Sequence, residues 1–336
     1  MRLLCELLHT IPPLPADEVL ACLEAERIVY TIGGESEDVL VVTASLSSDD
    51  VARLACRLSH TSVLDDYLFS CPVQDIAQNA RTHPLPAGGS LAVRVKNRST
   101  AVSSDDVINA LADVYSQGRS IDLQNPDHEI RALVTDQTVY VGKKLTEIDP
   151  SGFEQRKSQN RPFFTGITMH PRLARALVNL SRVRPGELFC DPFCGSGGIL
   201  LEAGLMGMSL LGGDIESKMT SGCSRTLEHY GVNRFQLFPI DIGKLPKYVP
   251  DVDGIATDFP YGRSTTTKGE ERNLLYKRAF NAITEMLKPD RYAVCGVADK
   301  DLLQLAPSNL VLQEVYDIRA HRSLTRSFAV FQKSKA

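Results

Sequence analysis

The stretch Phe189-Cys-Asp-Pro-Phe-Cys-Gly-Ser-Gly-Gly198 decides the fold class of the C-terminal half of this chain. Before the glycines, the pattern predicts a short strand over 187–190, and after them a helix from about 197 to 206. Gly195 and Gly197 let the main chain turn tightly with no Cβ in the way. The following helix presents free N–H groups at its N-terminus. We therefore predict a strand, a ligand-binding turn and a helix in succession.

Strands and helices alternate on both sides of this turn, which is the pattern of a parallel sheet with crossover helices. Pro171 opens a helix that runs to about 183, and later helices end near His229 and Lys288. Further strands are predicted over 209–213, 235–240, 252–257, 292–297, 310–319 and 327–332. No helical pattern separates the last two strands, so we expect them to form an antiparallel hairpin. The C-terminal half is predicted as an α/β fold with a mostly parallel sheet.

The N-terminal half is predicted as an α+β region without a catalytic constellation. Its strands are expected over 3–8, 27–30, 39–44, 91–96 and 139–141, and its helices over 17–25, 49–58, 73–81 and 104–117. Pro150-Ser151-Gly152 is a credible boundary. We therefore divide the chain into residues 1–150, a basic linker over 151–170, and a C-terminal domain over 171–336.

The composition is that of a globular protein with two or three domains. The chain has 336 residues, of which 43% are hydrophobic and 23% are charged. It has neither a signal-peptide pattern nor an apolar run near the roughly 20 residues that span a bilayer, so we expect a cytoplasmic protein that does not enter membranes. Eight cysteines are scattered without a CxxC pair, which favours reduced thiols and no metal site.

Three aspartates follow predicted strands and indicate the ligand. Asp191 precedes the glycines, Asp214 ends the second strand and Asp241 ends the third. At one edge of a parallel sheet they suit S-adenosylmethionine: Asp191 for the ammonium, Asp214 for the ribose hydroxyls and Asp241 for the adenine amine. A dinucleotide would require a third glycine where Leu200 stands, so a nicotinamide-dependent reductase is the weaker interpretation.

The segment Asp258-Phe-Pro-Tyr-Gly262 ends the fourth strand and is the predicted catalytic segment. An exocyclic amine of a base is a poor nucleophile, so it must be held in line with its N–H groups bonded to acceptors. Asp258 supplies an anionic acceptor, Pro260 biases Phe259 towards extended geometry that aims main-chain carbonyls at the amine, and Tyr261 offers a face for stacking. A base extruded from its stack would enter such a pocket.

The distribution of charge points to a nucleic acid although the net charge is −4. The segment 151–184 contains seven basic residues against Glu154 alone, and such a strip suits phosphate contacts, with a solvated linker as the alternative. A second basic patch holds Arg319, Arg322 and Arg326. The predicted RNA-binding residues are Lys143, Lys144, Arg156, Lys157, Arg161 and Arg263.

Several motifs resemble the archaeal tRNA guanine-N2 methyltransferases that act at position 10. They are Arg161-Pro-Phe-Phe-Thr-Gly166, Met169-His-Pro-Arg-Leu-Ala-Arg175 and Asp258-Phe-Pro-Tyr-Gly-Arg263, while the glycine turn resembles the class I methyltransferases of the amino-methylating branch more broadly. Leu123-Gln-Asn-Pro-Asp-His-Glu-Ile-Arg131 resembles the closing segment of a THUMP RNA-binding domain. The resemblance covers nearly the whole chain, and is strongest over 121–141 and 161–263. It implies a ferredoxin-like and THUMP region followed by a Rossmann-like class I methyltransferase domain.

The resemblance also implies a cofactor, a substrate and a set of residues. The predicted cofactor-binding residues are Phe164, Thr165, Met169, Asp191, Cys194, Gly195, Ser196, Gly197, Asp214, Ile215, Asp241 and Ile242. The predicted catalytic residues are Asp258, Phe259, Pro260 and Tyr261, and Phe259 departs from the proline usual in that motif.

The implied activity is methyl transfer from S-adenosyl-L-methionine to the N2 amine of guanine 10 in tRNA, giving N2-methylguanosine with N2,N2-dimethylguanosine left open. A small activating protein subunit is also left open, and we otherwise expect a monomer. The alternatives are an amino-methyltransferase that acts on ribosomal RNA or DNA, and a non-catalytic RNA-binding protein with a degenerate Rossmann-like domain.

Overall fold

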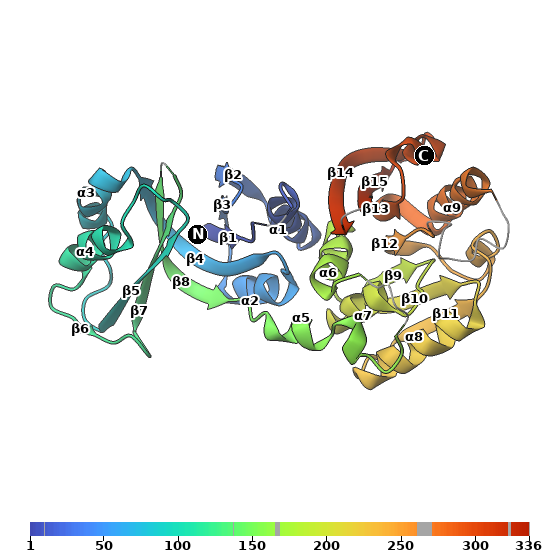
Figure 1. The fold of residues 1–336 in the computed structure, drawn as a ribbon, viewed down its shortest axis with the longest axis horizontal. Coiled ribbons are helices and arrows are strands. Elements are labelled where there is room, and N and C mark those ends of the chain that lie inside the picture. The colour runs from blue at the N-terminus through green and yellow to red at the C-terminus, as the bar shows by residue number, and fades with distance from the viewer. Residues whose placement is uncertain (10, 137, 165–168, 261–270, 322–323, 336) are drawn as a thin grey trace. The chain divides into compact units, whose positions relative to one another are not determined.

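The computed structural model describes residues 1–9, 11–136, 138–164, 169–260, 271–321 and 324–335 (Figure 1). Its contacts divide the chain into two compact units that interleave in sequence. Unit 1 comprises Met1–Thr10, Ile28–Ala55 and Thr61–Ile148, and unit 2 comprises Ile11–Arg27, Cys56–His60 and Asp149–Ala336. The domain limits drawn from the sequence stay a prediction, but two segments from the first 60 residues pack with unit 2.

Unit 1 is built on one eight-stranded sheet with the order β2-β3-β1-β4-β8-β7-β5-β6. The strands are β1 (Arg2–Leu7), β2 (Tyr30–Ser36), β3 (Val39–Ala44), β4 (Thr61–Cys71), β5 (Ser90–Asn97), β6 (Ser120–Ile121), β7 (His128–Val134) and β8 (Val139–Glu147). Neighbouring strands are antiparallel except that β5 runs parallel to both β6 and β7. The α+β class predicted for this region is confirmed.

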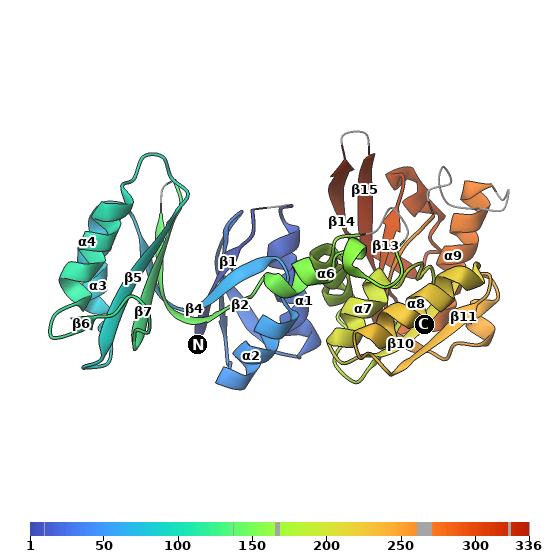
Figure 2. The same cartoon turned by 60° about the horizontal axis from the view of Figure 1, so that its bottom comes forward.

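The helices of unit 1 are α2 (Ser48–Arg57), the short 3-10 helix η1 (Val73–Asp75), α3 (Ile76–Thr82) and α4 (Ser104–Tyr115). Helices α3 and α4 cover one face of the sheet around β5 and β7, as Figure 2 shows. Ile76, Leu91 and Leu111 lie in the core between them. The Oγ of Ser103 caps α4 by accepting a hydrogen bond from the main-chain N–H of Asp106.

Three strands of unit 1 have no counterpart in the prediction, and one predicted strand is wrong. The pattern predicts no strand over β4, β6 or β7, and β2 begins only at Tyr30, beyond most of the predicted 27–30. Aspartate is depleted in strands, yet β4 carries two in its middle. One of them, Asp65, is buried and accepts a hydrogen bond from Arg131 of β7 at 2.8 Å, a partner that no local pattern reveals.

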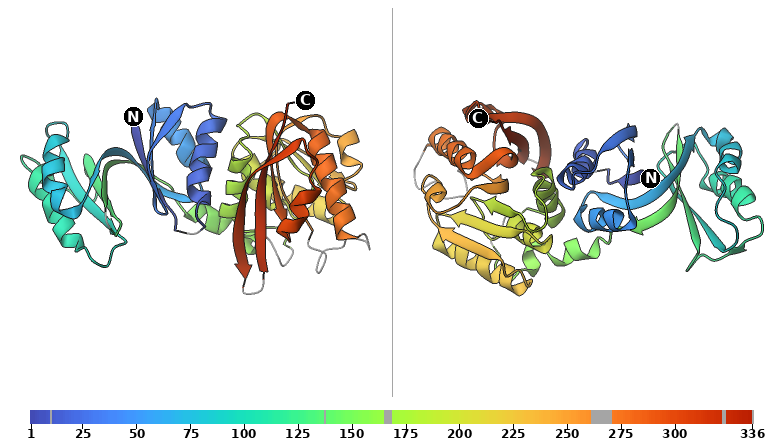
Figure 3. Two further views of the ribbon diagram at one scale, coloured as in Figure 1. Left: turned by 90° about the horizontal axis from the view of Figure 1, so that it is seen from above. Right: turned by 180° about the vertical axis from the view of Figure 1, so that it is seen from behind.

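Unit 2 contains a seven-stranded sheet with the order β11-β10-β9-β12-β13-β15-β14. The strands are β9 (Leu188–Asp191), β10 (Ser209–Asp214), β11 (Phe235–Pro239), β12 (Val252–Asp258), β13 (Leu287–Val297), β14 (Leu310–His321) and β15 (Leu324–Lys333). Strands β9 to β13 are parallel, whereas β15 is antiparallel to both β13 and β14 (Figure 3). The predicted parallel sheet and its terminal hairpin are confirmed.

Helices cover both faces of this sheet (Figure 1). The first layer holds α6 (Pro171–Leu180), α7 (Gly198–Leu205) and α8 (Ser217–His229); the second holds η3 (Leu245–Lys247), α9 (Arg272–Met286) and η4 (Lys300–Leu305). Successive residues of a strand point to opposite faces, so Leu210 enters the first core and Leu211 the second. The short elements α5 (Ser151–Gln155) and η2 (Ser158–Asn160) precede α6.

Helix α1 (Leu14–Ala25) packs against α6 through a buried carboxylate. Glu18 is fully buried and accepts hydrogen bonds from the Oγ of Ser59 at 2.6 Å, the N–H of His60 at 2.8 Å and the Nδ2 of Asn179 at 2.8 Å. Burial opposes its ionisation, but these bonds and the nearby His60 lower the pKa of Glu18 below its usual value. This cluster explains why residues 11–27 and 56–60 belong to unit 2.

In the described part of the chain, no helix is both long and apolar enough to cross a membrane.

Candidate active site

Three of the four aspartates predicted for one edge of the sheet are strand-final residues in unit 2. Asp191, Asp214 and Asp258 are the last residues of β9, β10 and β12, which lie side by side in the sheet. The parallel register pairs Gly212 of β10 with Asp191, so these strands end at the same edge. Ligands of open α/β sheets bind at this edge.

The glycine turn between β9 and α7 crosses the end of β10. The N–H of Cys194 donates to the carbonyl of Gly213 at 2.8 Å, and Gly195 and Gly197 take φ values of 49° and 86°. A Cβ on Gly197 would lie 2.6 Å from the Sγ of Cys223 on α8. Gly197 is therefore required by its left-handed conformation and also by close packing against α8.

Asp191 is 2% exposed and holds the strand ends together. Its Oδ1 accepts the Thr257 hydroxyl at 2.6 Å and the N–H of Phe193 at 3.2 Å. Burial, together with the neighbouring carboxylates of Asp258 and Asp214, raises the pKa of Asp191 to about 7. The site therefore has an excess of negative charge that a cationic ligand would relieve.

Asp214 supports the glycine turn directly. Its Oδ2 accepts the N–H of Gly195 at 3.2 Å, and its Oδ1 accepts the N–H of Glu216 at 2.9 Å. Burial raises the pKa of Asp214. A carboxylate oxygen has two lone pairs, so both oxygens can accept a further hydroxyl.

Asp241 lies two residues beyond the end of β11 and is part of an ion pair. Arg278 of α9 donates to its two oxygens at 2.7 and 3.2 Å, and the N–H of Gly243 donates at 2.9 Å. Hydrogen bonding to Arg278 is the main cause that lowers the pKa of Asp241.

Of the neighbouring predicted residues, Ile215 is exposed, whereas the Ile242 side chain is 3% exposed within the core. A cofactor contact from Ile242 would have to come from its main chain.

Asp258 is held by an arginine that the sequence did not connect with it. The Nη1 of Arg326 on β15 donates to the Oδ2 of Asp258 at 3.0 Å. A Cβ on Gly296 of β13 would lie 2.4 Å from the other oxygen of this carboxylate, so glycine provides room for it there. The sequence signals were the basic patch that contains Arg326 and the predicted hairpin, but neither gives the distance between the two side chains.

Phe259 replaces the usual proline and lies in the core. Its ring is 1% exposed and packs with Phe193, Tyr276 and Phe280 at centroid distances of 5.2, 4.8 and 5.1 Å. Its N–H donates to the carbonyl of Gly296 at 2.9 Å, a bond that proline cannot make. The structure thus places the Phe259 side chain among structural contacts.

The carbonyl of Pro260 accepts the Tyr276 hydroxyl at 3.5 Å, and Tyr261 lies outside the described residues.

The remaining predicted cofactor residues lie on the turn and before α6. Cys194 and Ser196 are buried in the glycine turn. Phe164 is 50% exposed, and Met169 is partly buried against the first core. Thr165 is outside the described residues.

Most of the basic segment is engaged within unit 2. Arg156 and Arg175 share the buried Glu202, with shortest contacts of 2.8 and 2.9 Å. The other contacts join Lys157 to Glu154, Arg172 to the carbonyl of Ser59, Arg182 to Glu24, and Arg184 to Glu187. Arg161 is 5% exposed. In unit 1, Lys144 pairs with Glu129 and Glu147, whereas Lys143 has no ion-pair partner among the described residues; Arg263 lies outside them.

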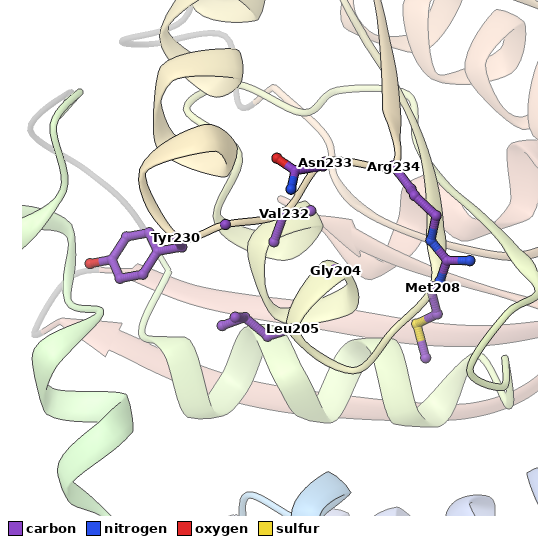
Figure 4. A pocket seen from close by; sticks show the side chains of 8 residues that line it. Gly204, Leu205, Met208, Tyr230, Val232, Asn233 and Arg234 are labelled. Atoms are coloured by element: carbon purple, nitrogen blue, oxygen red, sulfur yellow. The ribbon is translucent and has the colours of Figure 1, made fainter.

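A pocket of about 370 Å³ lies at the opposite edge of the sheet (Figure 4). Leu205, Tyr230, Val232 and Arg234 line it, at the ends of α7 and α8 and the start of β11. It is therefore distinct from the aspartate edge. Among the described residues, no cluster of three or more His, Cys, Asp and Glu side chains is suited to a metal ion.

Comparisons with known proteins agree with this geometry. Residues 158–327 match an RMKL-like methyltransferase domain, and residues 74–143 match a THUMP domain. The tRNA (guanine(10)-N2)-dimethyltransferase of Methanothermobacter thermautotrophicus is 31% identical over 99% of this chain and 100% of its own length. This chain belongs to the archaeal tRNA (guanine-10-N2) methyltransferase family. The same-named enzyme of Methanocaldococcus jannaschii is 33% identical over 95% of this chain and 96% of its own.

The methyltransferase fold is also shared with solved structures. TrmN from Thermus thermophilus has a TM-score of 0.56 and 21% identity over 99% of this chain and 100% of that chain. In this methyltransferase the predicted class I domain is therefore confirmed, as is the THUMP domain before it. The residues at the edge fit S-adenosylmethionine, because burial raises the pKa of the Asp191 and Asp214 carboxyls there, and a ligand that carries positive charge would favour their ionised forms.

Proposed function

We propose that this methyltransferase transfers methyl groups from S-adenosyl-L-methionine to the N2 amine of guanine 10 in tRNA. The observation that carries the proposal is the position of Asp258 at the carboxyl end of β12, on the edge that also holds Asp191 and Asp214. Family membership supports the substrate, because the two archaeal relatives are named for this reaction.

The cofactor would be held by the glycine turn and the flanking aspartates. Asp191 would balance its positive charge, Asp214 would accept from the ribose, and Asp241 would accept from the adenine amine while remaining paired to Arg278. Bound there, S-adenosylmethionine supplies a methyl group activated by its sulfonium and leaves as S-adenosylhomocysteine. Phe164, Thr165 and Met169 would border its methionine part.

Asp258 would act on the amine itself. Its carboxylate accepts an N–H bond from the guanine amine, so that the nitrogen lone pair can point at the methyl group. As the N–C bond forms, the nitrogen becomes positive, and Asp258 can take the proton that it then loses. Arg326 donates to one carboxylate oxygen and so fixes the orientation of the group. Tyr261 is proposed to stack on the extruded base, which would reach the site by leaving its own stack.

The tRNA would be captured by the THUMP domain and by basic side chains. Lys143 and Lys144 lie on β8, at the end of the segment that matches the THUMP domain, and Arg156, Lys157 and Arg263 are the further candidates for phosphate contacts. We propose a cytoplasmic monomer that adds one or two methyl groups, with a small activating subunit as an optional partner.

Mass spectrometry of tRNA nucleosides tests the proposal. Unmodified tRNA is incubated with the protein and S-adenosylmethionine, then digested and compared with matched ribosomal RNA and DNA. The expected product is N2-methylguanosine, with or without N2,N2-dimethylguanosine, in tRNA and at position 10. Methylation of another base, or of ribosomal RNA or DNA in preference to tRNA, would contradict the proposal.

A further inference from the structure

Arg161 carries a buried guanidinium whose two terminal nitrogens have no partner. The residue is 5% exposed, and its Nε donates to the carbonyl of Arg156 at 2.8 Å. Among the described residues, neither Nη1 nor Nη2 reaches a hydrogen-bond acceptor, although both are buried. A buried cation without acceptors is strongly unfavourable, so this side chain lacks an anionic or carbonyl ligand in the structure.

The unpartnered end of Arg161 faces the start of α7. Its Nη1 lies 3.0 Å from the position that a Cβ on Gly198 would occupy, and Gly198 is the first residue of α7, directly after the glycine turn. The first N–H groups of a helix are unsatisfied and carry partial positive charge. A guanidinium beside them adds positive charge to positive charge, which is favourable only when an anion binds between or beside them.

Among the described residues of unit 2, no carboxylate supplies that anion. Glu202, the carboxylate whose charge acts on Arg161, already accepts from Arg156 at 2.8 and 3.1 Å and from Arg175 at 2.9 Å. Burial is the main cause that lowers the pKa of Arg161, and the nearby charge of Arg156 acts in the same direction. Each of the six other basic residues in 151–184 has an acceptor for a terminal nitrogen within the described residues, or a paired carboxylate, so Arg161 is the exception in its segment.

We propose that Arg161 binds the carboxylate of the methionine moiety of S-adenosylmethionine. The inference rests on the cofactor of the proposed function, and it moves Arg161 from RNA binding to cofactor binding. Two terminal N–H groups of arginine match the two oxygens of a carboxylate. The charges of the ligand and the site then correspond: its carboxylate meets Arg161 and the α7 terminus, while its sulfonium and ammonium meet the aspartate edge.

Calorimetry with two ligands tests this assignment without tRNA. The ligands are S-adenosylmethionine and decarboxylated S-adenosylmethionine, which keeps the sulfonium and the ammonium but lacks the carboxylate. The proteins are the wild type, Arg161→Met, Arg161→Lys, and Arg184→Met as a control that loses a paired guanidinium elsewhere in the segment. Thermal unfolding of each variant checks that it is folded, and Arg161→Lys carries the test if Arg161→Met is not.

We expect Arg161→Met to weaken S-adenosylmethionine binding about 10- to 100-fold and Arg161→Lys to weaken it less, because lysine keeps the charge without the paired donors. Binding of the decarboxylated ligand should change less than about threefold in every variant. Equal losses for both ligands would show a purely structural role, and an unchanged affinity for S-adenosylmethionine would also overturn the inference. A wild type that binds the cofactor but leaves guanine 10 unmethylated would contradict the proposed function alone.

Discussion

The aspartate edge of the sheet and the basic segment over 151–184 are both conspicuous in the sequence, but the structure uses them differently. At the edge, three aspartates at strand ends remain together and share an excess of negative charge. In the basic segment, Arg156 and Arg175 share Glu202, and Arg182 pairs with Glu24, both of which are distant in sequence. The order of the strands keeps residues at neighbouring strand ends close together. The net charge of a sequence segment, in contrast, does not predict a positively charged surface, because carboxylates from elsewhere in the chain pair with it.

Replacing Asp258 is expected to have the largest effect on catalysis of any change at the aspartate edge. Asp258→Ala is expected to lower kcat for tRNA methylation by about 10²- to 10³-fold, because the amine loses its anionic acceptor. Affinity for S-adenosylmethionine should stay within about twofold, since the cofactor residues are intact. Single-turnover kinetics and calorimetry measure the two effects. Asp317→Ala, which removes an exposed carboxylate on β14 that is paired to Lys300 of η4, is the control and should leave kcat unchanged.

Gly197 tests whether the turn at the edge is set by packing as well as by conformation. Gly197→Ala places a methyl group against Cys223 and keeps a residue at φ 86°, so the unfolding free energy should fall by roughly 3 kcal/mol. Gly186 has the same φ of 86° with nothing within 4 Å of its Cβ position. Gly186→Ala should therefore cost only about 1–2 kcal/mol. Urea denaturation distinguishes the two, and equal losses would remove the packing argument.

The pH dependence of cofactor binding reports the charge of the edge. Asp191 has a pKa of about 7, above the value of about 3.9 in an unfolded chain. Its contribution to stability is therefore complete below about pH 4 and is lost as the pH rises through about 7. A cationic ligand prefers the ionised form, so affinity for S-adenosylmethionine should increase about tenfold between pH 6 and pH 8.

Asp191→Asn isolates this effect, because the amide cannot titrate. The variant should bind the cofactor with a flatter pH profile than the wild type, and its unfolding free energy should decline less between pH 4 and pH 7 than that of the wild type. Identical pH profiles for the two proteins would assign the titration to another group.

The smallest expected effects concern the basic residues. Lys143→Ala, which removes a lysine without an ion-pair partner in the described chain, should weaken tRNA binding about two- to fivefold and lower the salt slope by about one. Arg182→Ala, which removes a guanidinium bonded to Glu24, should change tRNA affinity less than about twofold. Filter binding across salt concentrations measures both. A larger loss of tRNA affinity for Arg182→Ala would instead support the prediction that the basic segment contacts RNA.

The features that depend on residues close together in the sequence could be predicted from it. The parallel strands, the terminal hairpin and the aspartates that end β9, β10 and β12 all follow from motif and periodicity. The sequence did not predict what depends on partners distant in the chain. Strand β4 is not predicted because its middle is charged, and the partner of Asp65, which is Arg131 of β7, is distant in the chain.

The site shows the same limit. Arg326 reaches Asp258 only because β15 folds back beside β13, and Arg161 is buried only because its segment packs on α7. Phe259 looked like an altered pocket residue, but its N–H bonds to Gly296 and its ring fills the core. Side-chain direction and long-range pairing decided these three cases, and neither is encoded in residue spacing.

The central claim is that Asp258 presents an exocyclic amine of guanine to the cofactor at the edge of the sheet. The most direct measurement is transfer of labelled methyl to two tRNA transcripts that differ only at position 10, one with guanosine and one with inosine, which lacks the N2 amine. We predict stoichiometric labelling of the guanosine transcript and none of the inosine transcript. Equal labelling of the two would contradict the claim, because the methyl group would then be going to an atom other than N2 of that base.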